Sequence, residues 1–147
     1  MKVFEKQLYQ IESNFARHQI HLILEDMMND QYISGAQYLQ ICKNQLIHET
    51  STEIIRTVSN TMKRVFKQYI PVEYFEKITG EMFELLLDEV LVKGKITDKA
   101  TRQTLLETII YCCQNENHCS MVVKWLEDGF AQNTKGKKID DMPLTTT

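Results

Sequence analysis

The chain has 147 residues, a length that fits one domain. It is 43% hydrophobic and 25% charged, with 5 glycines and 2 prolines, and this composition excludes disordered and collagen-like chains. The formal net charge of −3 provides no general attraction to nucleic acid or to an anionic membrane. We therefore expect one globular domain, with neither nucleic acid nor a membrane among its partners.

The apolar runs of the sequence are short. The longest, near residues 85–87 and 105–111, fall well below the ~20 residues that a membrane-spanning helix needs. Residues 1–10 mix charged and apolar side chains and lack the apolar segment of a signal peptide. The cytoplasm is therefore the default expectation for the location of the chain.

The spacing of apolar residues predicts helices almost throughout. Between residues 4 and 30, apolar side chains recur at steps of three, four and seven, which indicates one long helix or two abutting helices. Ser34 and Gln37 have the spacing of a capping box, in which each side chain binds a free N–H of the first turn. Thr50 and Glu53 have the same spacing, so each pair predicts the start of a further helix.

Proline, glycine and capping residues mark the later helices. The third helix ends at Ile70, because a residue before proline is disfavoured in a helix, and Pro71 suits the first turn of the fourth. Gly94 predicts the end of that fourth helix. Thr97 or Asp98 then caps a fifth helix.

A last helix is predicted to end at Gly129, which makes about six helices within residues 1–130. No run alternates apolar and polar residues as a strand would, so the predicted class is all-α. The short turns favour antiparallel neighbours, as in a helical bundle or an α-solenoid. Residues 131–147 are rich in Lys, Asp and Thr, and we expect a polar linker or the truncated start of a further segment.

The sequence contains no recognisable catalytic set. The HExxH motif is absent, and the glycines at positions 35, 80, 94, 129 and 136 stand too far apart to form a phosphate-binding loop. His18 and His21 lie three residues apart, with Glu25 four residues further on, which is how a helical metal site can begin. The plainer interpretation is that these three are polar residues beside an apolar stripe. No reaction is therefore assigned to the chain alone.

Three of the four cysteines lie close together, as Cys112, Cys113 and Cys119, with His118 beside the last. Soft sulfur ligands and a histidine suit zinc, but adjacent residues of a helix point about 100° apart, which makes joint binding by Cys112 and Cys113 difficult. A disulfide between Cys112 and Cys119 fits a helix-turn-helix. Buried free thiols, this disulfide and a metal site all stay open as interpretations.

A basic patch is predicted on the third helix, where Lys63, Arg64 and Lys67 lie opposite the apolar face. These side chains could contact a partner at the surface. The alternative is an ordinary solvated helix face, because no aromatic residues accompany the charges.

Three segments, taken in order, resemble the C-terminal helical domain of aminopeptidase N-like zinc metallopeptidases. Residues 24–39 (LEDMMNDQYISGAQYL) resemble the segment that joins its first helices, and residues 49–55 (ETSTEII) resemble the entry into the following helix. Residues 109–119 (IIYCCQNENHC) and 122–126 (VVKWL) resemble a later helical hairpin. The resemblance extends over roughly residues 20–130.

The resemblance implies a HEAT-like arrangement of antiparallel helix pairs, forming an α-solenoid or right-handed superhelix that caps the peptide-binding cavity. In secreted animal members this hairpin is bridged by two cysteines seven apart, which here implies Cys112 and Cys119. The zinc ion and all catalytic residues belong to an upstream domain, so this chain would hold no cofactor. Its partners would be the parent's catalytic domain and, indirectly, the peptide substrate.

The leading functional expectation is therefore a non-catalytic domain of a zinc aminopeptidase. Such a domain would expose apolar surface through which it could also self-associate. One alternative is a stand-alone helical module that binds a partner helix or peptide in a groove. A further alternative is a small metal-binding or thiol-redox protein built on Cys112, Cys113, His118 and Cys119.

Overall fold

The computed structural model describes residues 7–93 and 96–143, with the backbone alone described from residue 140 onward, and this part of the chain is mostly helical. In order, the elements are the 3-10 turn η1 (Leu8–Gln10), the helices α2 (Asn14–Asn29), α3 (Gly35–His48), α4 (Thr52–Gln68) and α5 (Val72–Leu85), the π-helical turn η2 (Leu86–Val92), the helices α6 (Lys99–Tyr111) and α7 (Glu116–Asp128), and the strands β1 (Phe130–Gln132) and β2 (Lys138–Pro143). The all-α expectation therefore holds for most of the chain.

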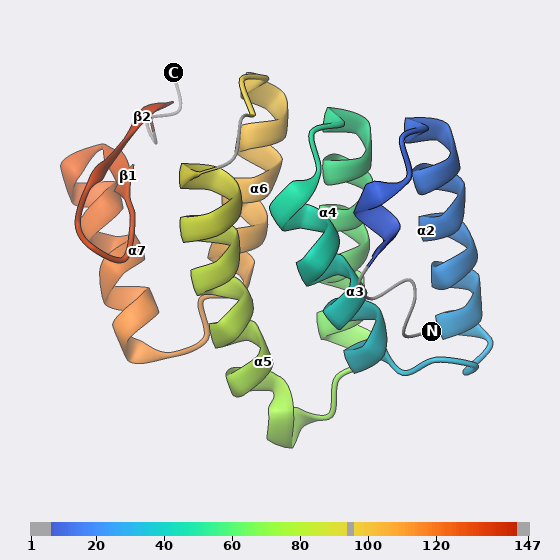
Figure 1. The fold of residues 1–147 in the computed structure, drawn as a ribbon. Helices are drawn as coiled ribbons and strands as arrows, with labels where there is room; N and C mark the ends of the chain where they lie inside the picture. Colours follow the sequence, from blue (N-terminus) through green and yellow to red (C-terminus); the bar gives the residue numbers. More distant parts are fainter. Residues whose placement is uncertain (1–6, 94–95, 144–147) are drawn as a thin grey trace.

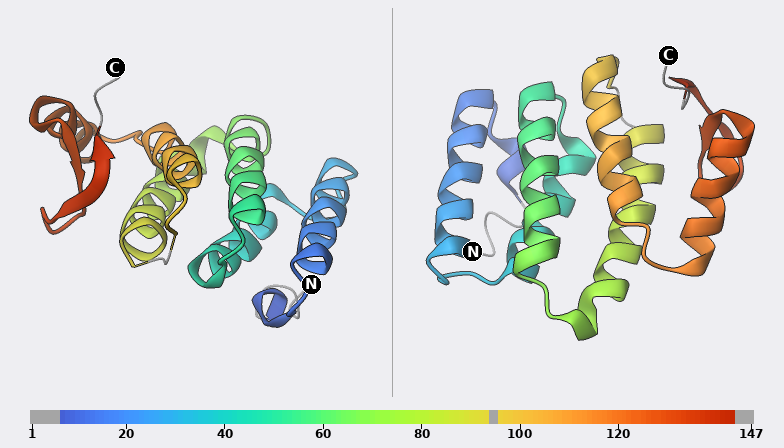
Figure 2. Two further views of the ribbon diagram at one scale, coloured as in Figure 1. Left: turned by 90° about the horizontal axis from the view of Figure 1, so that it is seen from above. Right: turned by 180° about the vertical axis from the view of Figure 1, so that it is seen from behind.

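The helices lie side by side in two layers. Seen from above, α2, α4 and α6 form one layer, while η1, α3 and α5 form the other, and α7 with the strands lies at one end of the row (Figures 1 and 2). Helix α4 has a central place, because it packs against α2, α3 and α6. Its side chains Ile55, Val58, Met62 and Val65 are all fully buried in the core.

Local signals placed most helix starts correctly. Ser34 accepts a hydrogen bond from the Gln37 N–H at 3.2 Å, and the Gln37 side chain accepts one from the Ser34 N–H at 2.9 Å, so the capping box is confirmed. Asp98 caps α6 by accepting from the Thr101 N–H at 2.8 Å. Gly129 ends α7 with a φ of +74°, in the left-handed region that favours glycine.

The region before residue 30 contains a break rather than one long helix. Within it, residues 1–6 lie outside the described residues, and η1 is separated from α2 by an extended segment. Helix α2 begins after Ser13, whose side chain accepts a hydrogen bond from the Ala16 N–H at 3.2 Å. The apolar spacing could not distinguish a continuous helix from this arrangement, in which a three-residue 3-10 turn precedes a helix of 16 residues.

The capping box predicted at Thr50 and Glu53 is wrong. Helix α4 starts after Ser51, and no side chain of that residue caps it. Instead, the Glu49 Oε1 atom accepts from the N–H groups of Thr50 at 2.9 Å and Ser51 at 2.8 Å. The Thr50 N–H that the local pattern assigned to Glu53 is therefore bound by Glu49, a carboxylate held in place by the distant Arg17.

Two further features were not expected. The fourth predicted helix becomes π-helical at Leu86, and the neighbouring leucines Leu86 and Leu87 are both fully buried there. The predicted stop at Gly94 lies outside the described residues. Beyond α7 the structure has a two-stranded antiparallel sheet where a linker was expected. Ala131 and Ile139 are buried, so the chain does not leave the fold at residue 131.

Candidate functional site

The turn between α6 and α7 carries the predicted cysteine cluster. Helix α6 ends as the Cys112 N–H bonds to the carbonyls of Thr108 and Ile109, at 3.1 and 3.0 Å. Helix α7 begins as the Asn115 side chain accepts from the His118 N–H at 2.9 Å. Because both ends of the turn are capped, the side chains between them have defined directions.

The structure brings Cys113, not Cys112, to Cys119. The Cys113 thiol donates to the Cys119 sulfur at 3.1 Å, and the Cys119 thiol lies 3.8 Å from the Cys113 carbonyl oxygen. Cys113 is half-buried and Cys119 is exposed. Cys112 instead is fully buried in the core, and burial raises the pKa of its thiol to about 12. The predicted Cys112–Cys119 pair is therefore not the pair that the structure places in contact, and all four cysteines are free thiols.

His118 points away from the thiols and toward α5. Its ring stacks on Phe83 with centroids 4.0 Å apart and planes inclined by 11°. The Asn115 side-chain amide lies 3.0 Å from Nδ1 and donates to it, which places the ring proton on Nε2, 3.6 Å from the Glu84 carboxylate. The four residues Cys112, Cys113, His118 and Cys119 are thus not gathered around one point. In residues 7–93 and 96–143, no group of three or more His, Cys, Asp or Glu side chains is placed to hold a metal ion.

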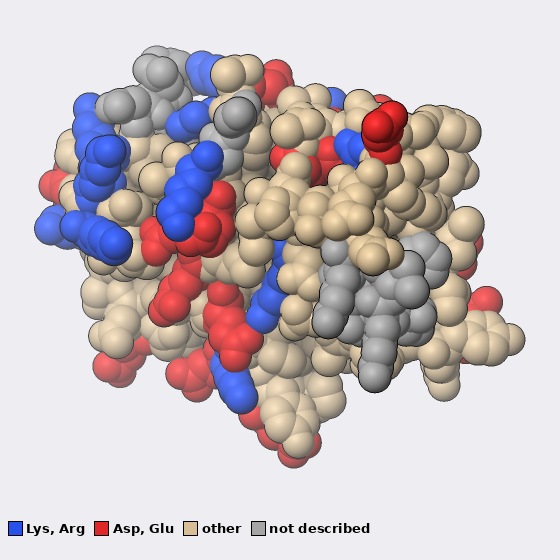
Figure 3. Space-filling model, viewed as in Figure 1, with Lys and Arg blue, Asp and Glu red and all other residues tan. Residues whose placement is uncertain are grey.

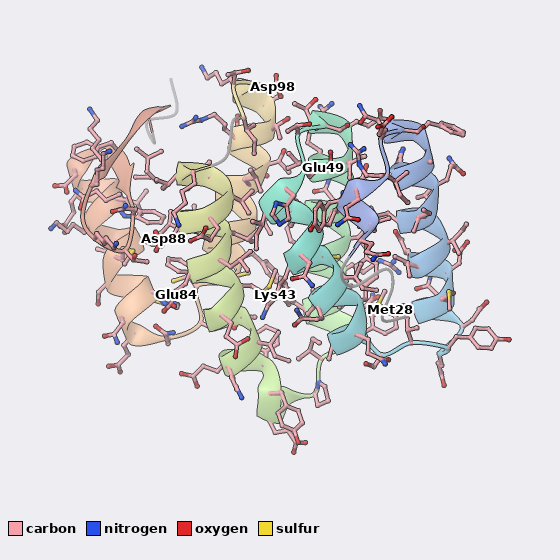
Figure 4. The ribbon with its side chains drawn as sticks, viewed as in Figure 1. Met28, Lys43, Glu49, Glu84, Asp88 and Asp98 are labelled. Carbon is pink, nitrogen blue, oxygen red and sulfur yellow. The ribbon has the colours of Figure 1, made fainter. Side chains whose placement is uncertain are left out.

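A hollow of about 490 Å³ lies between α5 and the start of α7, and we take it as the candidate binding site. Figure 3 shows acidic side chains gathered over α5, and Figure 4 shows Glu84 and Asp88 on the side of α5 and η2 that faces α7. The lining residues are Glu73, Glu76, Lys77, Gly80, Glu81, Glu84, Asn115 and His118. Carboxylates outnumber basic groups in this lining, so the hollow suits a positively charged group.

One of the lining carboxylates is already paired. Glu81 accepts a hydrogen bond from the Lys43 ammonium of α3 at 2.8 Å. This bond, together with the nearby charge of Lys43, lowers the pKa of Glu81 below its usual value. A cation entering the hollow would therefore meet Glu73, Glu76 and Glu84 first.

A buried network of polar contacts lies elsewhere, between α2 and the end of α3. Arg17 Nη2 and Nε bind the two oxygens of Glu49 at 2.8 and 2.9 Å, and Gln45 donates to the same carboxylate. Arg17 also binds Asn14 and two backbone carbonyls before α2. Burial alone would raise the pKa of Glu49, but the bonds from Arg17, from the Ser51 N–H and from Gln45 outweigh it and lower that pKa. This network holds α2 against the end of α3 through a buried charge pair, so its role is to stabilise the fold.

The three residues considered as a metal site, His18, His21 and Glu25, have separate surroundings. His21 is 1% exposed, neither ring nitrogen has a hydrogen-bond partner among the described residues, and burial lowers its pKa to about 4. His18 Nδ1 lies 3.7 Å from Glu53, whereas Glu25 pairs with Arg64 of α4. The plainer interpretation of polar residues beside an apolar stripe fits His18 and Glu25, and His21 belongs to the core.

The predicted basic patch of Lys63, Arg64 and Lys67 is divided, because Arg64 pairs with Glu25. Arg64 turns toward α2, where it binds Glu25 and also donates to Asn29 Oδ1 at 3.1 Å. Lys67 is exposed and Lys63 is half-buried. A surface contact through Lys63 and Lys67 stays a prediction, and Arg64 already serves to join α2 to α4.

Sequence reasoning missed the Arg17–Glu49 pair and the acidic hollow. One signal existed for the first, because Arg17 interrupts an apolar stripe and Glu49 immediately precedes a predicted helix start. The hollow had only a weak signal, the row of carboxylates on the fourth helix, which fitted a solvated acidic face equally well.

A search of family models, of characterised proteins and of solved structures finds no match to this chain. No helix among the described residues has both the length and the apolar character needed to cross a membrane.

Proposed function

We propose that the chain is a non-catalytic, HEAT-like helical domain of an aminopeptidase N-like zinc metallopeptidase, an enzyme that removes N-terminal residues from peptides. It would cap the substrate cavity of a catalytic domain that holds the zinc ion. The resemblance of residues 20–130 suggests the parent family. The observation that carries the proposal is the exposed apolar surface on the two helices at the ends of the row.

Both end helices present large apolar side chains to solvent. On α2, Phe15 is 74% exposed and Ile23 is 56% exposed, and on α7, Val123 is 52% and Leu126 is 63% exposed. Single exposed apolar residues are common on any protein. Among the described residues, five of the eleven exposed large apolar residues lie on these two terminal helices, where a row of helices would be continued or covered by a neighbour, and the others lie elsewhere: Tyr32, Ile47, Val72, Tyr74, Val92 and Ile110. The apolar side chains exposed on the two end helices support a domain that works in contact with others.

The use of the polar groups supports the same role. Arg17 and Glu49 bind each other, His118 stacks on Phe83, and Arg64 joins α4 to α2. These groups stabilise the packing of helices. A domain that acts by shape and contact, closing a cavity and excluding water, needs such a rigid frame.

The proposal is tested with an antibody raised against the recombinant chain and applied to an extract of the source cells. We expect a band much heavier than 17.3 kDa. Immunocaptured material should release a fluorophore from an aminoacyl amide, lose that activity with a zinc chelator and regain it with added zinc. Antibody pre-absorbed with recombinant chain is the control. A single band at the mass of this chain, without aminopeptidase activity, would overturn the proposal.

The second candidate, a stand-alone interaction module, is favoured by the acidic hollow between α5 and α7. Its carboxylates fit a basic peptide, whose binding should weaken as salt screens the charges. The test is the fluorescence anisotropy of a lysine-rich peptide, with an acidic peptide of equal length for comparison. We expect Glu76→Gln with Glu84→Gln to weaken binding, while Glu127→Gln, on α7 outside the hollow, leaves it unchanged. Equal weakening by all three substitutions would count against this site.

A further inference from the structure

The inference concerns the thiols at the α6–α7 turn, and it does not depend on the proposed function. Cys113 follows the C-terminal end of α6, and Cys119 lies in the first turns of α7. Their sulfur atoms are 3.1 Å apart, with the Cys113 thiol donating to the Cys119 sulfur. A disulfide bond is about 2.05 Å long, so a modest approach brings these two atoms within bonding distance.

The two thiols differ in their access to solvent. Cys119 is exposed and borders an open hollow of about 630 Å³ on the outer face of α7, with Ser120 and Val123. Cys113 is half-buried behind it. A small reactant from solution would therefore reach Cys119 first, with Cys113 already in contact as the second sulfur.

We propose that Cys113 and Cys119 form a site of reversible oxidation, at which a hydroperoxide converts the two thiols into a disulfide that fastens α7 to the end of α6. Cys112 takes no part, because its side chain is fully buried in the core.

The chemistry proceeds in two steps. The Cys119 sulfur attacks the O–O bond of the hydroperoxide, which breaks and yields a sulfenic acid on Cys119 and an alcohol, or water when the oxidant is hydrogen peroxide. The Cys113 sulfur then attacks the Cys119 sulfur, so that the S–S bond forms and the S–O bond breaks. The hydroxyl group leaves as water with the proton from Cys113. The two sulfurs have supplied the two electrons that reduce the hydroperoxide, and a thiol such as glutathione reverses the bridge by exchange.

The proton on Cys113 matters in the second step, because a thiol has to lose its proton as it attacks. Burial, the hydrogen bond to Cys119 and the proximity of that second sulfur raise the pKa of Cys113 to about 12. Cys113 is thus held as a thiol beside Cys119, and its proton is available for the water that leaves in the second step. Cys119, as the more accessible sulfur, is the one that meets the oxidant.

The bridge would act on the end of the helical row. A disulfide between residues 113 and 119 closes a short loop around the turn, and it restricts any opening of α7 away from α6. The β1–β2 sheet packs on α7 and would be held with it. Cys119, Val123 and Leu126 follow one another at helical spacing on the exposed face of α7, so a partner covering that face would also shield Cys119 from the oxidant.

The test counts free thiols in the full chain. The reduced protein is treated with hydrogen peroxide, unfolded, alkylated and weighed by mass spectrometry. We expect four alkyl groups before oxidation and two after it, since the chain has four cysteines. Glutathione should restore all four. Amide hydrogen exchange in α7 should be slower in the oxidised protein.

Variants identify the pair. Cys113→Ser and Cys119→Ser should each abolish the peroxide-dependent loss of two thiols, whereas the matched control Cys112→Ala should retain it. If Cys112→Ala does not fold, cleavage after Glu116 and fragmentation of the linked peptides of the unmutated protein identify the bonded sulfur directly. A bridge from Cys112, a disulfide between two chains, or four free thiols after peroxide treatment would each overturn the proposal.

Discussion

The two ends of the helical row are held by different kinds of contact. At the N-terminal end, α2 is joined to α3 by the buried pair of Arg17 and Glu49, and the Glu49 Oε1 atom also accepts from the two backbone N–H groups that precede α4. At the C-terminal end, α7 is joined to α5 by stacked rings, in which Phe83 lies against His118 and the fully buried Trp125. Removing one partner of a buried charge pair leaves the other charge unpaired and strongly destabilises the fold. Truncating an aromatic side chain instead lowers stability in proportion to the apolar surface that is removed. Loss of one residue should therefore destabilise the whole N-terminal end, whereas at the C-terminal end it should increase local opening of the structure.

The largest effect is expected from Glu49→Gln. The substitution leaves the buried Arg17 charge without a carboxylate, and breaking one partner of a buried pair costs about 3–5 kcal/mol. The measurement is the free energy of unfolding from urea denaturation followed by circular dichroism. Lys43→Met, which removes the partner of the half-exposed Glu81, should cost less than about 1 kcal/mol. Equal losses in the two variants would contradict the contrast between buried and exposed pairs.

Trp125→Ala should produce a loss of similar size that stays local. Removing a fully buried tryptophan costs about 3–5 kcal/mol, because a cavity remains where the ring was. Hydrogen exchange should accelerate in α7 and in the strands that follow it, and remain slow in α3 and α4. Val123→Ala on the exposed face of α7 is the control and should change little. Uniform acceleration along the chain would show that the two ends are not independent.

Acidification should destabilise the N-terminal end through His21. Burial lowers the pKa of His21 from 6.5 to about 4, so between these values the unfolded chain binds a proton that the folded chain does not. The contribution of neutral His21 to the free energy of unfolding is therefore fully present above pH 6.5, and roughly 3 kcal/mol is lost as the pH drops toward 4. The charges that act on His21 besides burial are Glu49, which favours its protonation, and His18 and Arg17, which oppose it.

Unfolding free energies measured across this pH range test the expectation. His21→Leu should remove the loss between pH 6.5 and 4. A second loss should persist in this variant below pH 4.5, because the pKa of Glu49 is lowered in the folded state and its protonation at low pH breaks the pair with Arg17. An unchanged pH profile in His21→Leu would show that another group is responsible.

The smallest effect is expected where the strands meet η2. The Thr134 hydroxyl and N–H both donate to the Asp88 carboxylate, the latter at 3.2 Å, in an exposed position. Thr134→Ala removes one of these bonds and should cost about 1 kcal/mol or less, visible as faster exchange in β1 and β2 alone. Thr134→Ser keeps the hydroxyl and should behave as the unmutated chain. A global loss of stability in Thr134→Ala would mean that the sheet supports more of the fold than its contacts indicate.

The helix boundaries were predictable because their causes are local. The capping box of Ser34 and Gln37, the cap of Asp98 and the left-handed Gly129 each depend on bonds or backbone angles within three or four residues. Thr50 and Glu53 show the limit of that reasoning, since the Thr50 N–H that Glu53 was expected to bind is bound by Glu49 instead.

The sheet and the thiol pair were not predictable for a related reason. Ala131 and Ile139 are too few to form an apolar pattern, and they become core residues only when β1 packs against α7 and β2 pairs with β1. Whether Cys112 or Cys113 meets Cys119 depends on the direction in which α6 ends, because adjacent helical residues point about 100° apart. A shift of one residue therefore changes the partner.

The sequence by itself determined the helices, their order and most of their ends, because periodicity and capping act between near neighbours along the chain. Only the tertiary structure decided which polar groups meet. Arg17 and Glu49 are 32 residues apart, and Asp88 and Thr134 are 46 residues apart, so no local pattern contains either pair. Such contacts form where packed helices bring distant segments together, and the burial of the surrounding apolar side chains determines that geometry.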